Sequence, residues 1–383
     1  MADGPDGPHD AGRPNGRLDA ERAAWIAVAL TPGIGAARLA ALLTEFGSAS
    51  AILDAPGFAL RHVPGVGAAL RAALRARSTR DGEQVVVAAA AVGGRVLIPS
   101  DPEFPACLRE VDEPPAVLFA RGRVDLLQRP AIAVVGSRDH TRYGADVCRA
   151  VAVHVAGAGV VVVSGMARGL DAIAHAAALD AGGRTIGVLG NGLGVVYPAA
   201  NRALYDRVAA EGLLLTEFPP GDKPTAGSFP RRNRLISGLA RITVVVEAAA
   251  GSGALITAGT ALEQGREVAA VPGPVTSETS VGCNRLIRDG ATPLLDPTDL
   301  HPFYPEIRAW PLPAADPPGV RALPDGLSAA ERTLAELLTR APAHIDALAR
   351  ELERPVGLLL SQLGVLEIAG VVEQRPTGMF RRV

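Results

Sequence analysis

The residues best suited to chemistry lie in a short basic stretch near the middle of the chain. It contains five basic side chains and no acidic one, in a 383-residue chain whose formal net charge is only −2. The five are Lys223, Arg231, Arg232, Arg234 and Arg241. Positive charge concentrated in a loop and at the start of a helix binds phosphate groups. We therefore predict a phosphate-binding lip for a polyanion, and we favour single-stranded DNA as the ligand.

The sequence Phe229-Pro-Arg-Arg-Asn-Arg234 combines an aromatic ring with these cations. Arginine neutralises phosphates, and Phe229 can stack on a base without selecting its identity. Phe229 could equally anchor the loop in the core, and both interpretations stay open. For the arginines, the alternative is a solvated helix surface. Cations without an anion are unfavourable at a helix start, so the binding interpretation is preferred for most of them.

Short, continuous apolar runs indicate the elements that position this stretch. Such runs predict strands buried on both faces, as in a parallel sheet, and amphipathic helical segments lie between them. The fold class is therefore α/β, with a doubly wound, mostly parallel sheet whose ligands bind at the carboxyl ends of the strands. The predicted strands are 95–98, 116–119, 131–135, 160–163, 185–189, 213–216, 242–246 and 268–271.

Small residues and an arginine follow two of these strands. The first of the two, 131–135, ends in Gly136-Ser137-Arg138, and 160–163 is followed by Ser164-Gly-Met-Ala-Arg-Gly169. Glycine lets the backbone approach a phosphate, serine offers a hydroxyl and arginine a forked donor. Gly251-Ser-Gly253 at a later helix start could form an anion nest. Because these loops meet at one edge of one sheet, we expect a ligand face there.

Signatures of catalysis and of cofactors are missing from the sequence. It has no Walker phosphate loop, no G-x-G-x-x-G fingerprint, no nucleophile elbow and no metal-ligand spacing. His175 lies in an Ala-rich helical segment and is interpreted as a packed residue. Asp171, Glu217 and Glu247 are expected to cap helices or to pair with arginines. We expect no enzyme activity, no cofactor and no metal.

The chain divides into five predicted segments. Residues 1–17 form a disordered tail, 18–83 a helical domain, 84–305 the α/β core, 306–327 a Pro-rich linker and 328–383 a winged helix. In the helical domain, Thr31-Pro-Gly-Ile-Gly35 and Val63-Pro-Gly-Val-Gly67 resemble helix-hairpin-helix turns. Such turns contact a DNA backbone or simply connect packed helices, and both interpretations stay open.

Composition places the protein among soluble cytoplasmic proteins. The three cysteines, Cys107, Cys148 and Cys283, lie far apart and are expected to be reduced. No apolar run reaches membrane-spanning length, and the N-terminus lacks a signal-peptide core. Since the net charge is close to zero, binding of nucleic acid must come from a local patch.

The motifs together resemble the DNA-processing protein A (DprA/Smf) family, over most of residues 20–380 and in the expected order. The matching stretches are 135–138, 164–171, 229–238, 252–258, 265–273 and 282–287. One departure is Met166, where we expect Leu, a swap that conserves volume. The resemblance implies a helical sterile-alpha-motif-like domain, an extended Rossmann-like core and a winged helix. It implies a homodimer that binds single-stranded DNA, protects incoming DNA and helps load the RecA recombinase during natural transformation.

The resemblance also implies which residues contact DNA. They are Gly136, Ser137, Arg138, Gly165, Arg168, Gly169, Lys223, Phe229, Arg231, Arg232, Asn233 and Arg234.

Two other functions compete with this interpretation. A nucleotide phosphoribohydrolase could use the same core, but residues 250–254, Ala-Gly-Ser-Gly-Ala, lack the full Gly-Gly-x-Gly-Thr loop and its nearby glutamate. Release of a base from a nucleoside monophosphate would support that enzyme. A transcriptional regulator rests on the winged helix alone, and its segment 355–368 carries no basic residue. That composition argues against sequence-specific readout of the major groove. Docking of a partner is at least as good an interpretation of the winged helix.

Overall fold

A nine-stranded sheet lies at the centre of the first of two units, Met1–Pro311; the second is Leu312–Val383. The computed structural model describes residues 16–308, 310, 323–324, 326–340, 343–375 and 378–382. The sheet order is β1-β2-β6-β5-β4-β3-β7-β8-β9, with antiparallel pairing at β1–β2 and β2–β6 and parallel pairing elsewhere. The strands are β1 Arg95–Leu97, β2 Leu118–Gly122, β3 Ala131–Val135, β4 Val161–Ser164, β5 Thr185–Val188, β6 Leu213–Thr216, β7 Ile242–Val245, β8 Glu267–Ala270 and β9 Thr292–Pro293.

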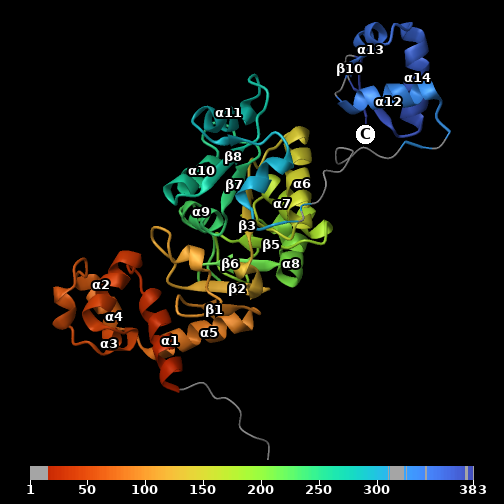
Figure 1. Ribbon diagram of the computed structural model, residues 1–383. Coiled ribbons are helices and arrows are strands. Elements are labelled where there is room, and N and C mark those ends of the chain that lie inside the picture. Colours follow the sequence, from red (N-terminus) through yellow and green to blue (C-terminus); the bar gives the residue numbers. More distant parts are fainter. Residues whose placement is uncertain are drawn as a thin grey trace, which may run out of the picture. The chain divides into compact units, whose positions relative to one another are not determined.

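Helices cover both faces of this sheet (Figure 1). On one face Leu235, Ala258 and Cys283 join the core formed by alternate strand residues such as Val163. On the other face Val151 and Ala174 pack against the intervening strand residues. The α/β, doubly wound class is therefore confirmed. The helices are α6 Arg142–Gly157, α7 Leu170–Asp180, α8 Arg202–Glu211, α9 Ser228–Gly238, α10 Gly253–Glu263 and α11 Val281–Arg288.

From residue 16 onward, five α-helices and one 3-10 helix precede the sheet; we call them the helical part. They are α1 Gly16–Ala29, α2 Ala36–Phe46, α3 Ala49–Asp54, η1 Ala59–His62, α4 Ala68–Arg75 and α5 Thr79–Ala91. In both Pro-Gly-x-Gly turns the first glycine has a positive φ (Gly33 +90°, Gly65 +77°), and the second is the N-cap of the next helix. Leu residues of α2 and α4 meet in one apolar cluster. The predicted boundary between the helical domain and the core, at residues 83 and 84, lies inside α5. The division into these two domains stays a prediction.

The second unit is a small helical bundle with a three-stranded sheet, the winged-helix order. Its elements are α12 Ala329–Arg340, β10 Ala343–His344, α13 Ile345–Glu351, α14 Val356–Ile368, β11 Val372–Arg375 and β12 Met379–Arg382, with sheet order β10-β12-β11. Ser328 and Glu331 form a capping box at the start of α12, since Glu331 Oε2 accepts from Ser328 N at 2.7 Å and Glu331 N donates to Ser328 Oγ at 3.3 Å.

Several predicted segments lie largely outside the described residues. Of the tail at 1–17 only residues 16–17 are described, as the first residues of α1, and of the linker at 306–327 only a few positions are described. Within the ranges given above, none of the helices combines the length and apolarity that crossing a bilayer requires.

The close contact between α1 and α5 gives a stability prediction. A Cβ added at Gly82 would lie 1.9 Å from the carbonyl oxygen of Ala23. We expect Gly82→Ala to lower the free energy of unfolding by about 1–3 kcal/mol, because the two helices must separate. Urea denaturation followed by circular dichroism measures this change.

Gly259 in α10 is the matched control, since its added Cβ would meet no atom within 4 Å. Gly259→Ala should be neutral or stabilising by up to about 1 kcal/mol, because alanine favours the helix. Equal effects of the two substitutions would contradict the close packing of α1 on α5.

Candidate nucleic-acid interface

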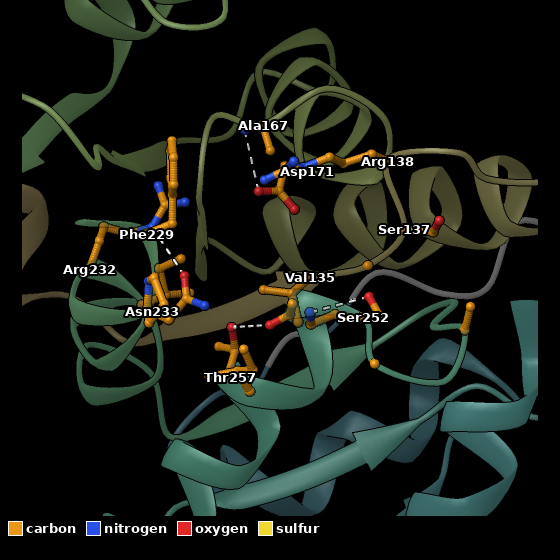
Figure 2. Close-up of a pocket in the computed structure, with 18 of the residues that line it drawn as sticks. Val135, Ser137, Arg138, Ala167, Asp171, Phe229, Arg232, Asn233, Ser252 and Thr257 are labelled. Atoms are coloured by element: carbon orange, nitrogen blue, oxygen red, sulfur yellow. Dashed lines mark hydrogen bonds between the residues drawn. The ribbon is translucent and has the colours of Figure 1, made fainter. Parts of the chain in front are cut away.

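A hollow of about 390 Å³ opens at the carboxyl end of β3. β3 lies between β4 and β7, and the chain leaves it toward β4 and returns to it through β7, which makes this the point where strand order reverses. Open α/β sheets bind their ligands in this crevice. Figure 2 shows Arg138 and Asp171 above the hollow, residues of α9 on one side, and Ser252 and Thr257 below.

A buried carboxylate holds the loop that carries Arg138. Glu247 follows β7, is 3% exposed, and accepts from Thr141 N at 2.8 Å and from Thr141 Oγ1 at 2.5 Å. The Glu247 carbonyl also accepts from Ser137 N at 2.8 Å. The loop after β3 is therefore fixed at both ends, while the Arg138 side chain is exposed. Among the described residues, no hydrogen bond or ion pair engages that side chain.

Gly169 brings the loop after β4 against the loop after β3. Its φ is +79°, and an added Cβ would lie 2.5 Å from the carbonyl oxygens of Ser137 and Arg138. Asn201 Nδ2 donates to the carbonyls of Met166 and Ala167 at 3.0 Å and holds the same loop from the other side. Glycine is therefore required by close approach of two main chains, in addition to any approach of a phosphate.

Arg232 lies beneath the hollow and is only 5% exposed. Its Nη1 donates to the carbonyls of Gly165, at 2.5 Å, and Val188, and its Nε donates to Asn233 Oδ1 at 3.2 Å. Burial, and secondarily the nearby Arg138, lower the pKa of Arg232 to about 10, while Asp171 opposes them. Arg232 is thus a positioning residue that joins α9 to β5 and to the loop after β4.

Asp171 is the carboxylate that accompanies Arg232. It is 7% exposed and accepts from Gly165 N at 3.1 Å and from Ala167 N at 3.4 Å. Burial raises its pKa, and Arg232 partly offsets this effect. An added Cβ at Gly165 would lie 2.7 Å from Asp171 Oδ2 and 2.8 Å from Arg232 Nη2, so only glycine fits between the two groups.

Phe229 and Asn233 of α9 complete this side of the hollow. The Phe229 ring is half-buried and lies against Gly190, where an added Cβ would come within 2.9 Å of Cδ1. Its centroid is 5.7 Å from that of the exposed Tyr197. The same ring also lines a smaller neighbouring hollow with Arg168. Phe229 therefore both packs and presents a ring to solvent.

Arg231 and Arg234 lie elsewhere. Arg234 Nη2 donates to Glu217, whose side chain is 4% exposed, and Arg231 Nε is 3.6 Å from the same carboxylate. Both arginines line a different hollow, between the core and residues 29–36 of the helical part. Burial raises the pKa of Glu217, and Arg234 is the main group that opposes it. The structure therefore does not bring Arg231 and Arg234 into the hollow at Arg138.

Lys223 and Arg168 are exposed cations on the same edge of the sheet. Lys223 lies in the loop that follows β6, and Arg168 in the loop that follows β4. Within the described ranges, neither side chain has a hydrogen-bond or ion-pair partner. Together with Arg138 they are three exposed cations at the carboxyl edge that form no ion pair with a described carboxylate.

Ser252 and Thr257 form the α10 side of the hollow. Ser252 Oγ accepts from Ala254 N at 3.3 Å as the N-cap of α10. The Gly251-Ser-Gly253 turn indicated this loop, but nothing in the sequence singled out Thr257.

His175 is buried in α7, and its ring nitrogen Nδ1 lies 2.6 Å from Thr185 Oγ1, which fits its interpretation as a packed residue. Burial lowers the pKa of His175 to about 3. No three potential metal ligands cluster among the described residues.

Family models match two segments of the chain. Residues 95–305 match DNA recombination-mediator protein A, and residues 315–378 match the DprA winged helix domain. The chain belongs to the DNA recombination-mediator protein A (DprA/Smf) family. It is 40% identical to protein Smf of Escherichia coli over 74% of this chain and 77% of that protein. It is 33% identical to protein Smf of Synechocystis over 95% of this chain and 99% of that protein.

Solved structures of the family share this architecture. DNA processing protein A from Streptococcus pneumoniae superposes with a TM-score of 0.60 at 34% identity, covering 74% of this chain and 96% of that one. The Helicobacter pylori protein gives a TM-score of 0.51 at 28% identity, covering 56% and 96%. The Helicobacter protein has a single-stranded DNA binding mode.

The burial of Arg232 predicts a pH-dependent loss of stability. Arg232→Ala leaves Asp171 buried without its cation and should lower the free energy of unfolding by about 3–5 kcal/mol. The pKa of Asp171 then rises further above its ordinary value of 3.8, so the folded state favours the protonated form. Below pH 3.8 Asp171 is protonated in both the folded and the unfolded state, so its raised pKa costs the variant no stability. As pH rises from 3.8 toward the folded pKa, the unfolded state loses the proton first and the folded state loses stability, so the deficit grows with pH. Urea denaturation at about pH 4.5 and 8 measures it.

Arg232→Ala combined with Asp171→Asn is the control for this prediction. The double variant has no buried carboxyl group at this position, so its deficit should not grow with pH. A pH-independent deficit in the single variant would contradict the electrostatic interaction between Arg232 and Asp171.

Proposed function

We propose that this chain binds single-stranded DNA across the carboxyl edge of its sheet, at the hollow that Arg138 overlooks. The observation that carries the proposal is a trio of exposed cations that have no ion-pair partner among the described residues. Arg138 and Arg168 line the two neighbouring hollows, and Lys223 lies in the loop after β6. Cations held in this way neutralise backbone phosphates without selecting a sequence.

The ring of Phe229 supports single-stranded rather than duplex DNA. It lies between the two hollows, and its contact with Gly190 fixes one side of it. An exposed ring can stack on a base only when that base is unpaired. The single-stranded DNA binding mode of the Helicobacter relative points the same way. Gly136, Ser137 and Asn233 would then supply backbone and polar contacts along the strand, while Gly165 and Gly169 let the loops close around it.

The roles of the arginines differ in this proposal. Arg138 and Arg168 contact phosphates, with Lys223 extending the path along the sheet edge. Arg232 acts through the loops that it positions. Arg231, exposed over 60% of its side chain, and Arg234 extend toward the helical part beside Glu217. They would meet a strand only beyond the Arg138 hollow.

The larger role is that of a recombination mediator rather than an enzyme. Asp171 in the hollow is held by two main-chain N–H groups, and Glu247 is held by Thr141, so both carboxylates already serve the loops. Family membership supports protection of incoming DNA, loading of RecA in natural transformation, a homodimer and a cytoplasmic location. A nucleotide phosphoribohydrolase remains the alternative activity, and assay of base release from nucleoside monophosphates tests it.

Salt-dependent binding of fluorescent oligo-dT tests the DNA site. We expect Arg138→Ala/Lys223→Ala to weaken binding and to reduce the log–log salt slope by about 1.4, since each lost phosphate contact contributes about 0.7. Anisotropy titrations at several salt concentrations measure affinity and slope together. Arg232 is left intact because its removal would disturb the loops.

Arg129→Ala is the matched control, because Arg129 is exposed at the opposite, amino-terminal end of β3. It should leave affinity and slope as in the wild type. If wild type ignores oligo-dT, or the Arg138/Lys223 variant binds as well as wild type, the proposed site is wrong.

Substitution of Phe229 separates stacking from packing. Phe229→Ala should cost about 1–3 kcal/mol of binding free energy, whereas Phe229→Trp should retain binding because a ring remains available. Both variants are compared by anisotropy after thermal melting has shown that they fold. Loss of stability with unchanged affinity in Phe229→Ala would show that the ring serves only as a core anchor.

A further inference from the structure

A second basic surface lies on the helical part of the first unit. Phe58, Arg61, Arg71 and Arg75 line an open hollow of about 440 Å³, which shares no residue with the hollow at Arg138. We call these four residues the Phe58 patch. No acidic residue lines the hollow. The sequence shows the same bias, since residues 55–80 contain five arginines and neither aspartate nor glutamate.

The helix α4 explains how two of these cations reach the surface together. Leu70 and Leu74 are buried in the apolar cluster of the helical part. Arg71 and Arg75 follow them directly, so they lie one turn apart on the outer side of the helix. Like charges at this spacing repel each other unless an anion lies between them.

Local contacts hold the arginines close to Phe58. Arg71 Nη1 donates to the carbonyl of Val66 at 2.8 Å, which fixes its side chain and leaves its other N–H groups available. The Arg75 side chain lies over Gly57, where an added Cβ would come within 2.8 Å of Nη1. In the part of the chain that the structure describes, no hydrogen bond or ion pair engages the side chains of Arg61 and Arg75.

Phe58 itself is not used by the core. It is the N-cap residue of η1, and 69% of it is exposed. An aromatic ring in water beside three guanidinium groups combines the two features that bind single-stranded nucleic acid: a stacking platform and phosphate donors. A peptide of acidic side chains would neutralise the arginines but would leave the ring without a stacking partner.

We propose that the Phe58 patch is a second contact for single-stranded DNA, on which Phe58 stacks a base while Arg61, Arg71 and Arg75 hold the flanking phosphates. The proposal rests on the proposed function, because the same strand would also occupy the hollow at Arg138. It gives the helical part of this chain a function in holding DNA, rather than in packing alone.

The test titrates the full chain with fluorescent oligo-dT of about 35 nucleotides, long enough for more than one contact region. Phe58→Ala/Arg61→Ala/Arg75→Ala should weaken binding about tenfold and reduce the salt slope by about 1.4. Arg71 is retained because it also holds the main chain at Val66. Circular dichroism melting establishes that the variant folds. The control, Val87→Ala/Arg129→Ala, removes an equally exposed apolar residue and an exposed arginine outside the patch, and should bind as wild type does.

Failure of this proposal is distinguishable from failure of the proposed function. If the Arg138/Lys223 variant loses binding and the triple patch variant binds as wild type does, the patch is not a DNA contact and the core site stands. If wild type does not bind oligo-dT, both proposals are overturned. If both variants lose affinity and slope, both contacts stand; if only the patch variant loses them, the patch binds DNA and the site at Arg138 is wrong.

Single substitutions then identify the interaction. Phe58→Trp should retain binding, and Phe58→Leu should lose as much as Phe58→Ala, because only a ring stacks on a base. Full binding by Phe58→Leu would overturn stacking of a base on Phe58.

Discussion

The candidate site depends on the hydrogen bonds that the buried guanidinium of Arg232 donates to main-chain carbonyls. One side chain bonds to the carbonyls of Gly165 and Val188 and is accompanied by Asp171, so it joins α9, β5 and the loop after β4. A charge in this position is tolerated because its donors meet carbonyl oxygens and a carboxylate lies nearby. Hydrogen bonds within the protein therefore fix this side of the hollow at Arg138.

Positive charge in this protein has two separate uses. Arg232 is buried near Asp171, Arg234 is partly buried against Glu217, and both determine where loops and helices lie. Arg138, Arg168 and Lys223 are exposed, and none of them has a carboxylate partner within the described residues. A count of basic residues in a sequence does not separate these two groups. Only the second group contributes a field that a polyanion can reach.

The strands of the sheet could be predicted from the sequence, whereas the separate roles of the arginines could not. Continuous apolar runs gave β3 and β6 with their observed bounds, because strands buried on both faces leave an unbroken apolar pattern. Arg231, Arg232 and Arg234 could not be separated in this way. Neighbouring positions on a helix point about 100° apart, so their burial depends on how α9 is rotated against the sheet. The carboxylates near them come from distant parts of the sequence, Asp171 from the first turn of α7 and Glu217 from the loop after β6. The limits of the helical domain and linker stay predictions.

The contact of Gly169 with the main chain at Ser137 and Arg138 has a consequence for the energetics of recognition. Two loops that touch through their backbones have little freedom left to lose when a ligand arrives. In the proposed complex with single-stranded DNA, the ordering entropy of binding would therefore fall mainly on the nucleic acid. A strand whose bases stack poorly on one another gives up less on entering such a rigid cleft than a strand that must first be unstacked. Base composition would then influence affinity through the flexibility of the strand, without any requirement that a side chain contact a base edge.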